Sequence, residues 1–528
     1  MKAEGIEADT SSGQPMAHRE VLESLSGLLL ALFVAMISST VVSTALPLII
    51  GSLNGTQTQY TWVVTATLLT ATATTPIWGK LADLFNKKSL VQVAIVIFVA
   101  GSMLSGFSQD TEQLIAARAF QGIGIGGLQA LVQVVIAAII PPRERGRYNG
   151  YLGAVMAVAT VGGPLLGGLI VDVSWLGWRW CFFVGVPIAV LAFAVLQRTL
   201  KLPTVRRDDV RVDYLGAGLI AAGVSILLVW VSFVDNTFGW LSWQTATMVG
   251  AGVVLLALAV LVESRVSEPV VPLRIVVQRT PALAIIASLA VGMAMFGGAV
   301  FLGQYFQIGR GYSPTEAGLL TIPMMAGVFV SSTVSGRMIS RSGSVKPYIV
   351  AGTMTLVVGF LGLGTVDHDS SLWIVGFAMA VVGIGVGMTM QNLVLAVQNS
   401  VPLRDLGAAS ASVTFFRSLG GTIGVSVLGA VLANRVTADL AAALHVPAGQ
   451  ESTGDVSALN LEALPPEVRT AVHTVYGDAT AHIFLISAAV AVVGVIAALL
   501  LKPITLRTTI DLEKKDEDTV ATDPVADR

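Results

Sequence analysis

Fourteen long apolar stretches constrain this chain more than any other feature of its sequence. Each stretch supplies the ~20 apolar residues that an α-helix needs to cross the ~30 Å hydrocarbon core of a bilayer. Charged residues make up only 12% of the chain, which is too few for a large soluble protein. The sequence therefore predicts an all-α membrane protein with 14 transmembrane helices, at about 25–50, 60–81, 89–107, 112–139, 148–171, 178–197, 213–234, 244–263, 281–306, 314–336, 347–366, 371–397, 408–433 and 479–501.

Lysine and arginine alternate by side along these predicted spans. With the N-terminus inside, 25 of the 31 basic residues fall in inner loops and tails, and four fall in outer loops. Loops rich in Lys and Arg face the cytoplasm. We therefore expect a multi-pass protein of the cytoplasmic (inner) membrane, with cytoplasmic tails at 1–24 and 502–528.

A glycine pattern repeats along the chain. Gly122-Ile-Gly-Ile-Gly126 recurs 261 positions later as Gly383-Ile-Gly-Val-Gly387, and the loops that follow match at the same offset. Glycine alone is common in packed membrane helices, but a shared offset across a helix and its loop indicates an internal repeat.

The repeat predicts the organisation of the chain. We expect two six-helix halves, 25–200 and 281–501, with two helices inserted in 201–280 and a long outer loop at 434–478. Parallel halves of this kind form one architecture of secondary transporters, with the substrate bound between them near the midplane. The chain has no Walker A sequence and no catalytic constellation, so we expect neither ATP-driven transport nor an enzyme activity. We also expect no cofactor and no metal.

The loop after the second predicted span reads GKLADLFNKK, starting at Gly79. It resembles the signature loop of the major facilitator superfamily, G-x-L-a-D-r-x-G-r-k, which latches the outward-facing state on the cytoplasmic side. The resemblance assigns a cytoplasmic gate to Gly79, Asp83 and Lys87, together with Arg143 in the next cytoplasmic loop. Asp83 is expected to accept hydrogen bonds at the N-terminus of a neighbouring helix. Asn86 replaces a family glycine, which is the least disruptive such change, because Asn tolerates the left-handed conformation better than most residues.

The fourth predicted span contains Arg118 followed by Gln121 and Gly122, which resembles the family motif R-x-x-q-G. An arginine near the centre of a membrane helix costs at least ~2.5–3.5 kcal/mol, so a partner or a pathway is expected. In similar antiporters this arginine is linked to proton movement. The alternative is that Arg118 snorkels to the nearby outer surface.

The fifth predicted span resembles the antiporter motif of exporters, g-x8-G-x3-G-P-x2-G-G, with Ala159 replacing one glycine. Proline bends a helix, and the surrounding glycines let another helix approach the bend. A merely close-packed helix pair is the alternative interpretation. The matching residues are Gly162, Gly163, Pro164, Gly167 and Gly168.

The resemblance covers nearly all of 25–501 and includes the sequence FRSLGG that starts at Phe416. Together with the fourteen spans, it is similar to the fourteen-helix drug:proton antiporter family, whose members export antiseptics, dyes and antibiotics. The resemblance implies an exporter of lipophilic drugs or antibiotics, driven by the proton-motive force through alternating access. The expected partners are a small lipophilic substrate, protons and the lipid bilayer, with a monomeric protein and no nucleic acid. The alternative is export of a lipid or an endogenous metabolite on the same fold.

One departure from the family concerns charge. Ser38 stands where many relatives have an aspartate, and no carboxylate lies near the middle of a predicted span. Proton coupling therefore rests on the resemblance, with Arg118 and Asp172 as the main candidates and His482 as a weaker one. Without a fixed negative charge, the cavity is expected to prefer neutral, zwitterionic or weakly charged lipophiles over cations.

Polar side chains beside aromatic ones are the expected lining of a lipophilic-drug cavity. For each candidate, ordinary interhelical packing is the alternative. The candidates are Ser38, Gln129, Gln133, Gln304, Tyr305, Gln307, Gln391, Asn392, Phe415 and Phe416.

Overall fold

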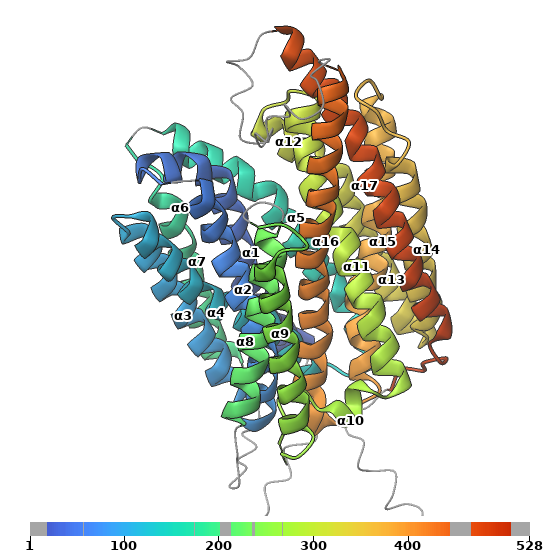
Figure 1. Cartoon of the computed structure of the whole chain (residues 1–528). Helices are drawn as coiled ribbons and strands as arrows, with labels where there is room; N and C mark the ends of the chain where they lie inside the picture. The colour runs from blue at the N-terminus through green and yellow to red at the C-terminus, as the bar shows by residue number, and fades with distance from the viewer. Residues whose placement is uncertain are drawn as a thin grey trace, which may run out of the picture.

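The computed structural model describes residues 18–55, 57–173, 175–200, 213–234, 238–266, 268–443 and 466–507. The regular elements named in these ranges are all helices (Figure 1). In chain order they are α1 (His18–Ser52), α2 (Gln57–Leu84), α3 (Lys87–Phe107), α4 (Thr111–Ile139), α5 (Pro142–Asp172), α6 (Trp180–Phe183), α7 (Gly185–Thr199), α8 (Tyr214–Phe233), α9 (Trp243–Glu263), α10 (Leu273–Val276), α11 (Arg279–Gln304), the π-helix η2 (Tyr305–Gly309), α12 (Pro314–Leu320), α13 (Ile322–Ser342), α14 (Lys346–Leu363), α15 (Leu372–Gln398), the 3₁₀-helix η3 (Leu403–Asp405), α16 (Leu406–Ala443) and α17 (Pro466–Leu500).

These helices form the predicted membrane spans. Three spans are interrupted, because α6 continues into α7, α11 into η2, and α12 into α13. Thirteen segments in the described part of the chain are long and apolar enough to cross a membrane. Helix α2 supplies the fourteenth span; its many threonines lower its hydropathy, and it packs among α4, α8 and α16.

The glycine repeat has a direct structural meaning. Helix α4 lies between α2 and α3, and α15 lies in the same way between α13 and α14. Gly124 lies so close to α3 that an added Cβ would be 2.5 Å from the Phe98 amide nitrogen. Its counterpart Gly385 would be 2.7 Å from the Leu356 nitrogen on α14. The G-x-G-x-G sequence thus lets one helix be packed closely on two sides, in each half.

The two halves repeat the same helix pairs. Helix α1 packs on α5 and α7, and α11 packs correspondingly on α16 and α17. The halves meet through two repeat-related pairs, α2 with α16 and α13 with α5. The predicted major facilitator fold, with two six-helix halves, is confirmed.

The inserted helices α8 and α9 pack on each other, and α8 also contacts α2 of the first half and α16 of the second. Apolar side chains of α8 form a small core with Ala259 of α9 and Phe415 of α16. Helix α9 lies on the outside of this layer, where most of its side chains face the lipid. The inserted pair therefore covers one seam between the halves (Figure 1).

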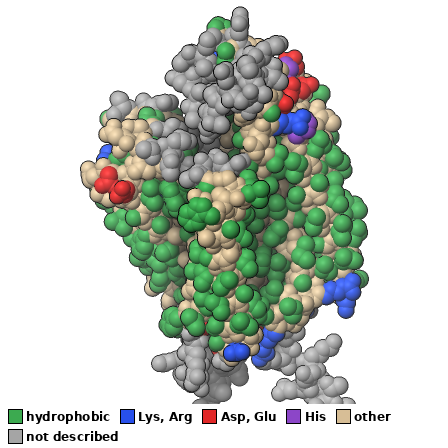
Figure 2. Space-filling model, in the orientation of Figure 1, with side chains coloured by type: hydrophobic (Ala, Val, Ile, Leu, Met, Phe, Trp, Pro, Cys, Tyr) green, Lys and Arg blue, Asp and Glu red, His purple; other side chains and the backbone are tan. Residues whose placement is uncertain are grey.

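The surface agrees with a membrane orientation. Hydrophobic side chains cover the middle of the molecule, and Lys and Arg gather at its lower end (Figure 2). By the positive-inside rule this lower end is the cytoplasmic side. At the other end α16 and α17 extend beyond the predicted spans, to Ala443 and from Pro466. They pack on each other, so both flanks of the predicted 434–478 loop are helical; 444–465 lie outside the described residues.

Candidate functional site

Asp83 joins the two halves at the cytoplasmic side. Its two carboxylate oxygens accept hydrogen bonds from the backbone nitrogens of Gly407 at 2.7 Å and Ala408 at 2.8 Å. These nitrogens belong to the first turn of α16, where N–H groups lack partners within the helix. The carboxylate also complements the positive end of the helix dipole. The hydrogen bonds expected of Asp83 are therefore present.

Gly79 makes this contact close. A Cβ at Gly79 would overlap the Ala411 side chain and would lie 2.7 Å from the carbonyl oxygen of Gly407. Helices α2 and α16 can therefore approach at this level only because residue 79 has no side chain.

Asn86 is the N-cap of α3 and does not adopt the left-handed conformation. Its φ is −63°, and its side chain caps α3 by accepting hydrogen bonds from the nitrogens of Lys88 at 2.9 Å and Ser89 at 3.4 Å. Asn at a helix start is stabilised by N-capping, which requires an extended backbone. Lys87 is the half-buried first residue of α3.

A second closure lies at the repeat-related position. A Cβ on Gly336 of α13 would overlap the carbonyl oxygen of Gly146 on α5. Arg143 then bonds the C-terminal end of α13, with Nε 3.2 Å from the Ser340 carbonyl oxygen and Nη2 3.3 Å from that of Arg341. One closure places a carboxylate on a helix N-terminus and the other a guanidinium on a helix C-terminus, and both complement the helix dipole.

Above these closures a ladder of amides and one arginine crosses between the halves. Buried Arg145 donates to Gln398 at 2.9 Å, and Gln398 donates to Ser410 at 3.0 Å. Gln133 of α4 donates to Gln391 of α15 at 2.8 Å. These hydrogen bonds between the halves lie from the level of Gln133 toward the cytoplasm. Most helices of the two halves diverge toward the opposite end (Figure 1), where α5 still contacts α12.

Arg118 lies inside the first half. The residue is 3% exposed, and its Nη1 donates to Gln121 at 2.6 Å. Gln121 in turn donates to Ser102 of α3 at 2.6 Å and to Ser38 of α1 at 3.2 Å. This network holds the guanidinium within the bundle, which disfavours snorkelling. It also places Ser38 in a buried network instead of on the lining of a cavity.

The antiporter motif packs α5 against α1. A Cβ on Gly163 would overlap the Thr40 side chain, and Thr40 donates to the Ala159 carbonyl oxygen at 3.0 Å. Gly167 is buried, while Gly162 and Gly168 have looser neighbours, Ile37 and Thr315. Pro164 and Asp172 belong to α5, but their side chains lie outside the described residues.

Only some of the predicted lining residues come together. Gln133 and Gln391 meet at the seam, and half-buried Gln129 lies one turn from Gln133. Asn392 is 1% exposed and donates to Met388 of its own helix at 2.7 Å.

The other predicted lining residues have different partners. Tyr305 donates to the Asp367 carbonyl oxygen at 2.8 Å, and Gln304 accepts from Tyr476 at 2.8 Å, so both brace the outer end of the second half. Gln307 is exposed at that end. Phe415 packs against the inserted helices, and Phe416 forms an edge contact with it, with ring centroids 5.1 Å apart.

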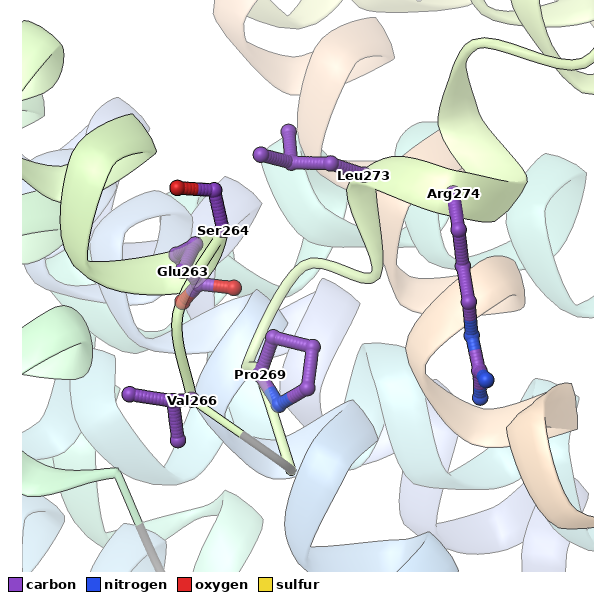
Figure 3. A pocket seen from close by; sticks show the side chains of 6 residues that line it. All are labelled: Glu263, Ser264, Val266, Pro269, Leu273 and Arg274. Atoms are coloured by element: carbon purple, nitrogen blue, oxygen red, sulfur yellow. The ribbon is translucent and has the colours of Figure 1, made fainter.

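A cavity of about 330 Å³ lies at the cytoplasmic end of α9 (Figure 3). The carboxylate of Glu263 accepts hydrogen bonds from the nitrogens of Val270 and Val271, both at 3.0 Å, which folds the following linker back. The lining residues are Glu263, Ser264, Val266, Pro269, Leu273 and Arg274.

The linker beyond this cavity is tied to both halves. Glu268 pairs with buried Lys80 of α2 at 2.5 Å, and Arg274 pairs with Asp405 just before α16 at 3.3 Å. These pairs could not be predicted from the sequence, because partners 188 and 131 positions apart leave no local pattern.

The fold and these contacts define a membrane transporter built from two repeated halves. The chain belongs to the Major Facilitator Superfamily, whose model matches residues 28–425. It is 36% identical over 485 residues to an uncharacterised MFS-type transporter of Mycobacterium tuberculosis (strain CDC 1551 / Oshkosh), covering 91% of this chain and 69% of the relative. It is 34% identical over 408 residues to the multidrug transporter protein MdtP of Bacillus subtilis (strain 168), covering 77% and 74%. The efflux pump dotC of Dothistroma septosporum is 32% identical over 498 residues, covering 92% and 84%.

Solved structures agree on the fold. The human organic anion transporter MFSD10 superposes with a TM-score of 0.58 at 12% identity, covering 89% of this chain and 99% of that one. The proton:xylose symporter XylE superposes with a TM-score of 0.59 at 15% identity, covering 91% and 95%. At these identities the likeness concerns the fold alone.

Proposed function

We propose that this protein exports lipophilic drugs or antibiotics across the cytoplasmic membrane, in exchange for protons, by alternating access. The observation that carries the proposal is the pair of repeat-related closures, Asp83 on α16 and Arg143 on α13, at the cytoplasmic side. Relatives named as a multidrug transporter and as efflux pumps support the direction of transport.

The transport cycle follows from these contacts. With both closures formed, the seam is shut toward the cytoplasm and substrate leaves toward the outside. Breaking them lets α2 separate from α16 and α5 from α13, which opens the seam to the cytoplasm. Because each closure is a few hydrogen bonds at a glycine contact, it can break and re-form as a unit without disturbing the core of either half.

Proton coupling is proposed to involve Arg118 and Asp172. The Arg118–Gln121–Ser38 network connects α4 to α1, and α1 contacts the antiporter motif through Thr40. The Arg118 network therefore ends on α1, the helix that packs on the antiporter motif of α5, whose outer end holds Asp172.

The driving force is sufficient for export. A membrane potential supplies ~2.3 kcal/mol per charge per 100 mV, and a tenfold gradient requires ~1.4 kcal/mol. One proton entering at ~150 mV would thus sustain roughly a 300-fold gradient of a neutral substrate.

The alternative, export of a lipid or an endogenous metabolite, would be favoured by a wide lateral opening beside the inserted helices. Helices α8 and α9 instead cover the seam between α2 and α16. We therefore favour drug export, by a monomer in the inner membrane.

A drug-susceptibility panel in an efflux-deficient host tests the proposal. Expression of the wild-type chain is expected to raise resistance to several lipophilic drugs, whereas Arg118→Ala at matched expression is not. Identical susceptibility with and without the wild-type chain would contradict drug export.

A further inference from the structure

Arg417 is a buried arginine whose side chain has no partner among the described residues. The residue lies in α16 and is 6% exposed, and its Nη1 atom is buried without a hydrogen-bond partner. No hydrogen bond or ion pair joins its side chain to any part of the chain that the structure describes. Arg118 and Arg145 are also buried, and each donates to a glutamine, although the Nε atom of Arg118 is likewise buried without a partner.

The depth of Arg417 places it near the middle of the membrane. It lies eleven residues after Leu406, where α16 begins, which corresponds to about 17 Å along the helix. The hydrocarbon core is ~30 Å thick, so an unpaired charge there is costly.

Arg417 is also level with the glutamine pair that joins the halves. Ser410 and Gln398 are hydrogen-bonded at 3.0 Å on the neighbouring helices α16 and α15, which run in opposite directions. Arg417 lies seven residues beyond Ser410, and Gln391 seven residues before Gln398. Seven residues are about two turns, or ~10 Å, so both side chains start on the same faces one level further out.

Gln391 adds a second donor at this level. Its Oε1 accepts from Gln133 of the other half at 2.8 Å. Its Nε2 makes no hydrogen bond to a described residue and is therefore free to donate. A guanidinium and an amide N–H at the same depth in the membrane are suited to bind an anion.

The residues that the structure describes provide no anion at this depth. The described Asp and Glu residues lie in loops or at helix ends; Asp478, although within α17, bonds His368 of the outer loop. The surrounding spans are apolar. A ligand that carries one negative charge on an apolar body would neutralise Arg417 and fit its surroundings.

We propose that Arg417 and Gln391 bind the anionic group of the transported lipophile, so that the preferred substrates carry a carboxylate or sulfonate. That these ligands are transported rests on the proposed function, whereas their binding to Arg417 and Gln391 can be tested without it. The absence of an aspartate at Ser38 predicted a preference for neutral, zwitterionic or weakly charged lipophiles. The anion site narrows this substrate preference to lipophiles that carry a negative charge.

Two probes with the same aromatic scaffold test the charge. 1-Anilinonaphthalene-8-sulfonate carries a sulfonate that N-phenyl-1-naphthylamine lacks. Their binding to purified protein in nanodiscs is followed by fluorescence, with empty nanodiscs subtracted. We expect Arg417→Gln to weaken binding of the sulfonate by about ten- to hundredfold, the range for a charge-assisted hydrogen bond, and to leave the neutral probe unchanged. Arg417→Lys should retain part of the affinity, and Arg337→Gln, at an exposed position of α13, is the matched control.

Three results would overturn the proposal: unchanged sulfonate binding, an equal loss for both probes, or Arg417-dependent heat stabilisation by chloride but not by the sulfonate. Removing an unpaired buried charge should not lower the unfolding temperature of the empty protein, so Arg417→Gln is expected to fold.

The same probes then separate the two proposals, anion binding and drug:proton exchange. If the binding difference is found but no variant transports either probe in response to a proton gradient, the anion site stands and drug:proton exchange fails.

Discussion

Asp83→Asn tests the cytoplasmic closure most sharply. The carboxylate accepts two hydrogen bonds, at 2.7 and 2.8 Å, from the first turn of α16. Asparagine has one oxygen to accept one of them, while its NH₂ group faces the second N–H, and the negative charge at the helix N-terminus is lost. One charge-assisted hydrogen bond and part of the dipole interaction together amount to about 2 kcal/mol. The equilibrium between closed and open seams should therefore shift roughly 30-fold toward the open state.

The accessibility of residue 410 reports this shift. Ser410 is fully buried, and the closures lie between it and the cytoplasm. A cysteine placed there should therefore react slowly with a membrane-impermeant maleimide added from the cytoplasmic side. Asp83→Asn should accelerate the reaction by about the same factor as the shift in population. Asp369→Asn, an exposed carboxylate in an outer loop, is the control. An unchanged rate at matched folding would refute the idea that Asp83 holds the seam shut.

Three further predictions concern separate sites. Arg118→Ala should abolish dye efflux from energised cells at normal expression, and Arg118→Lys should restore only part of it, because an ammonium lacks the planar fork of a guanidinium; normal efflux in the alanine variant would exclude a role in proton movement. Gly163→Leu should lower vesicle transport more than substrate binding in detergent, since the new side chain collides with Thr40; equal losses would mean that the glycine is only structural. A hydrogen bond to Asp478 raises the pKa of His368 above 6.5, so its stabilising contribution is present at low pH and is lost as the pH rises through the raised pKa. The difference in unfolding temperature between wild type and His368→Ala should shrink over that pH range, and a constant difference would contradict this.

The spans and the repeat could be predicted from sequence because both are local. Twenty apolar residues define a span whatever surrounds them, and the glycines at 122, 124 and 126 recur at a fixed offset. Asp83 could also be predicted to accept hydrogen bonds from a helix N-terminus, because the loop GKLADLFNKK matches a family pattern.

The partners of most side chains could not be predicted, for a physical reason. In a soluble helix the apolar face marks the core, but a membrane helix is apolar on the faces toward lipid and toward protein alike. Nothing in the sequence therefore showed that Gln391 faces Gln133 across the seam, while Tyr305 turns to an outer loop and Phe415 to the inserted helices. Arg145 is one of three arginines near the start of α5, and only the fold shows that it is the one that turns inward.

The central claim is that transport by this fold is driven by protons. The most direct measurement uses purified protein in proteoliposomes with an imposed pH gradient, acidic inside, and follows uptake of N-phenyl-1-naphthylamine and 1-anilinonaphthalene-8-sulfonate by inside-out molecules. If transport is driven by protons, the probes accumulate inside above the concentration reached by equilibration. This accumulation collapses when a protonophore is added and is absent with Arg118→Ala. Uptake that stops at equal concentrations and ignores the gradient would contradict it.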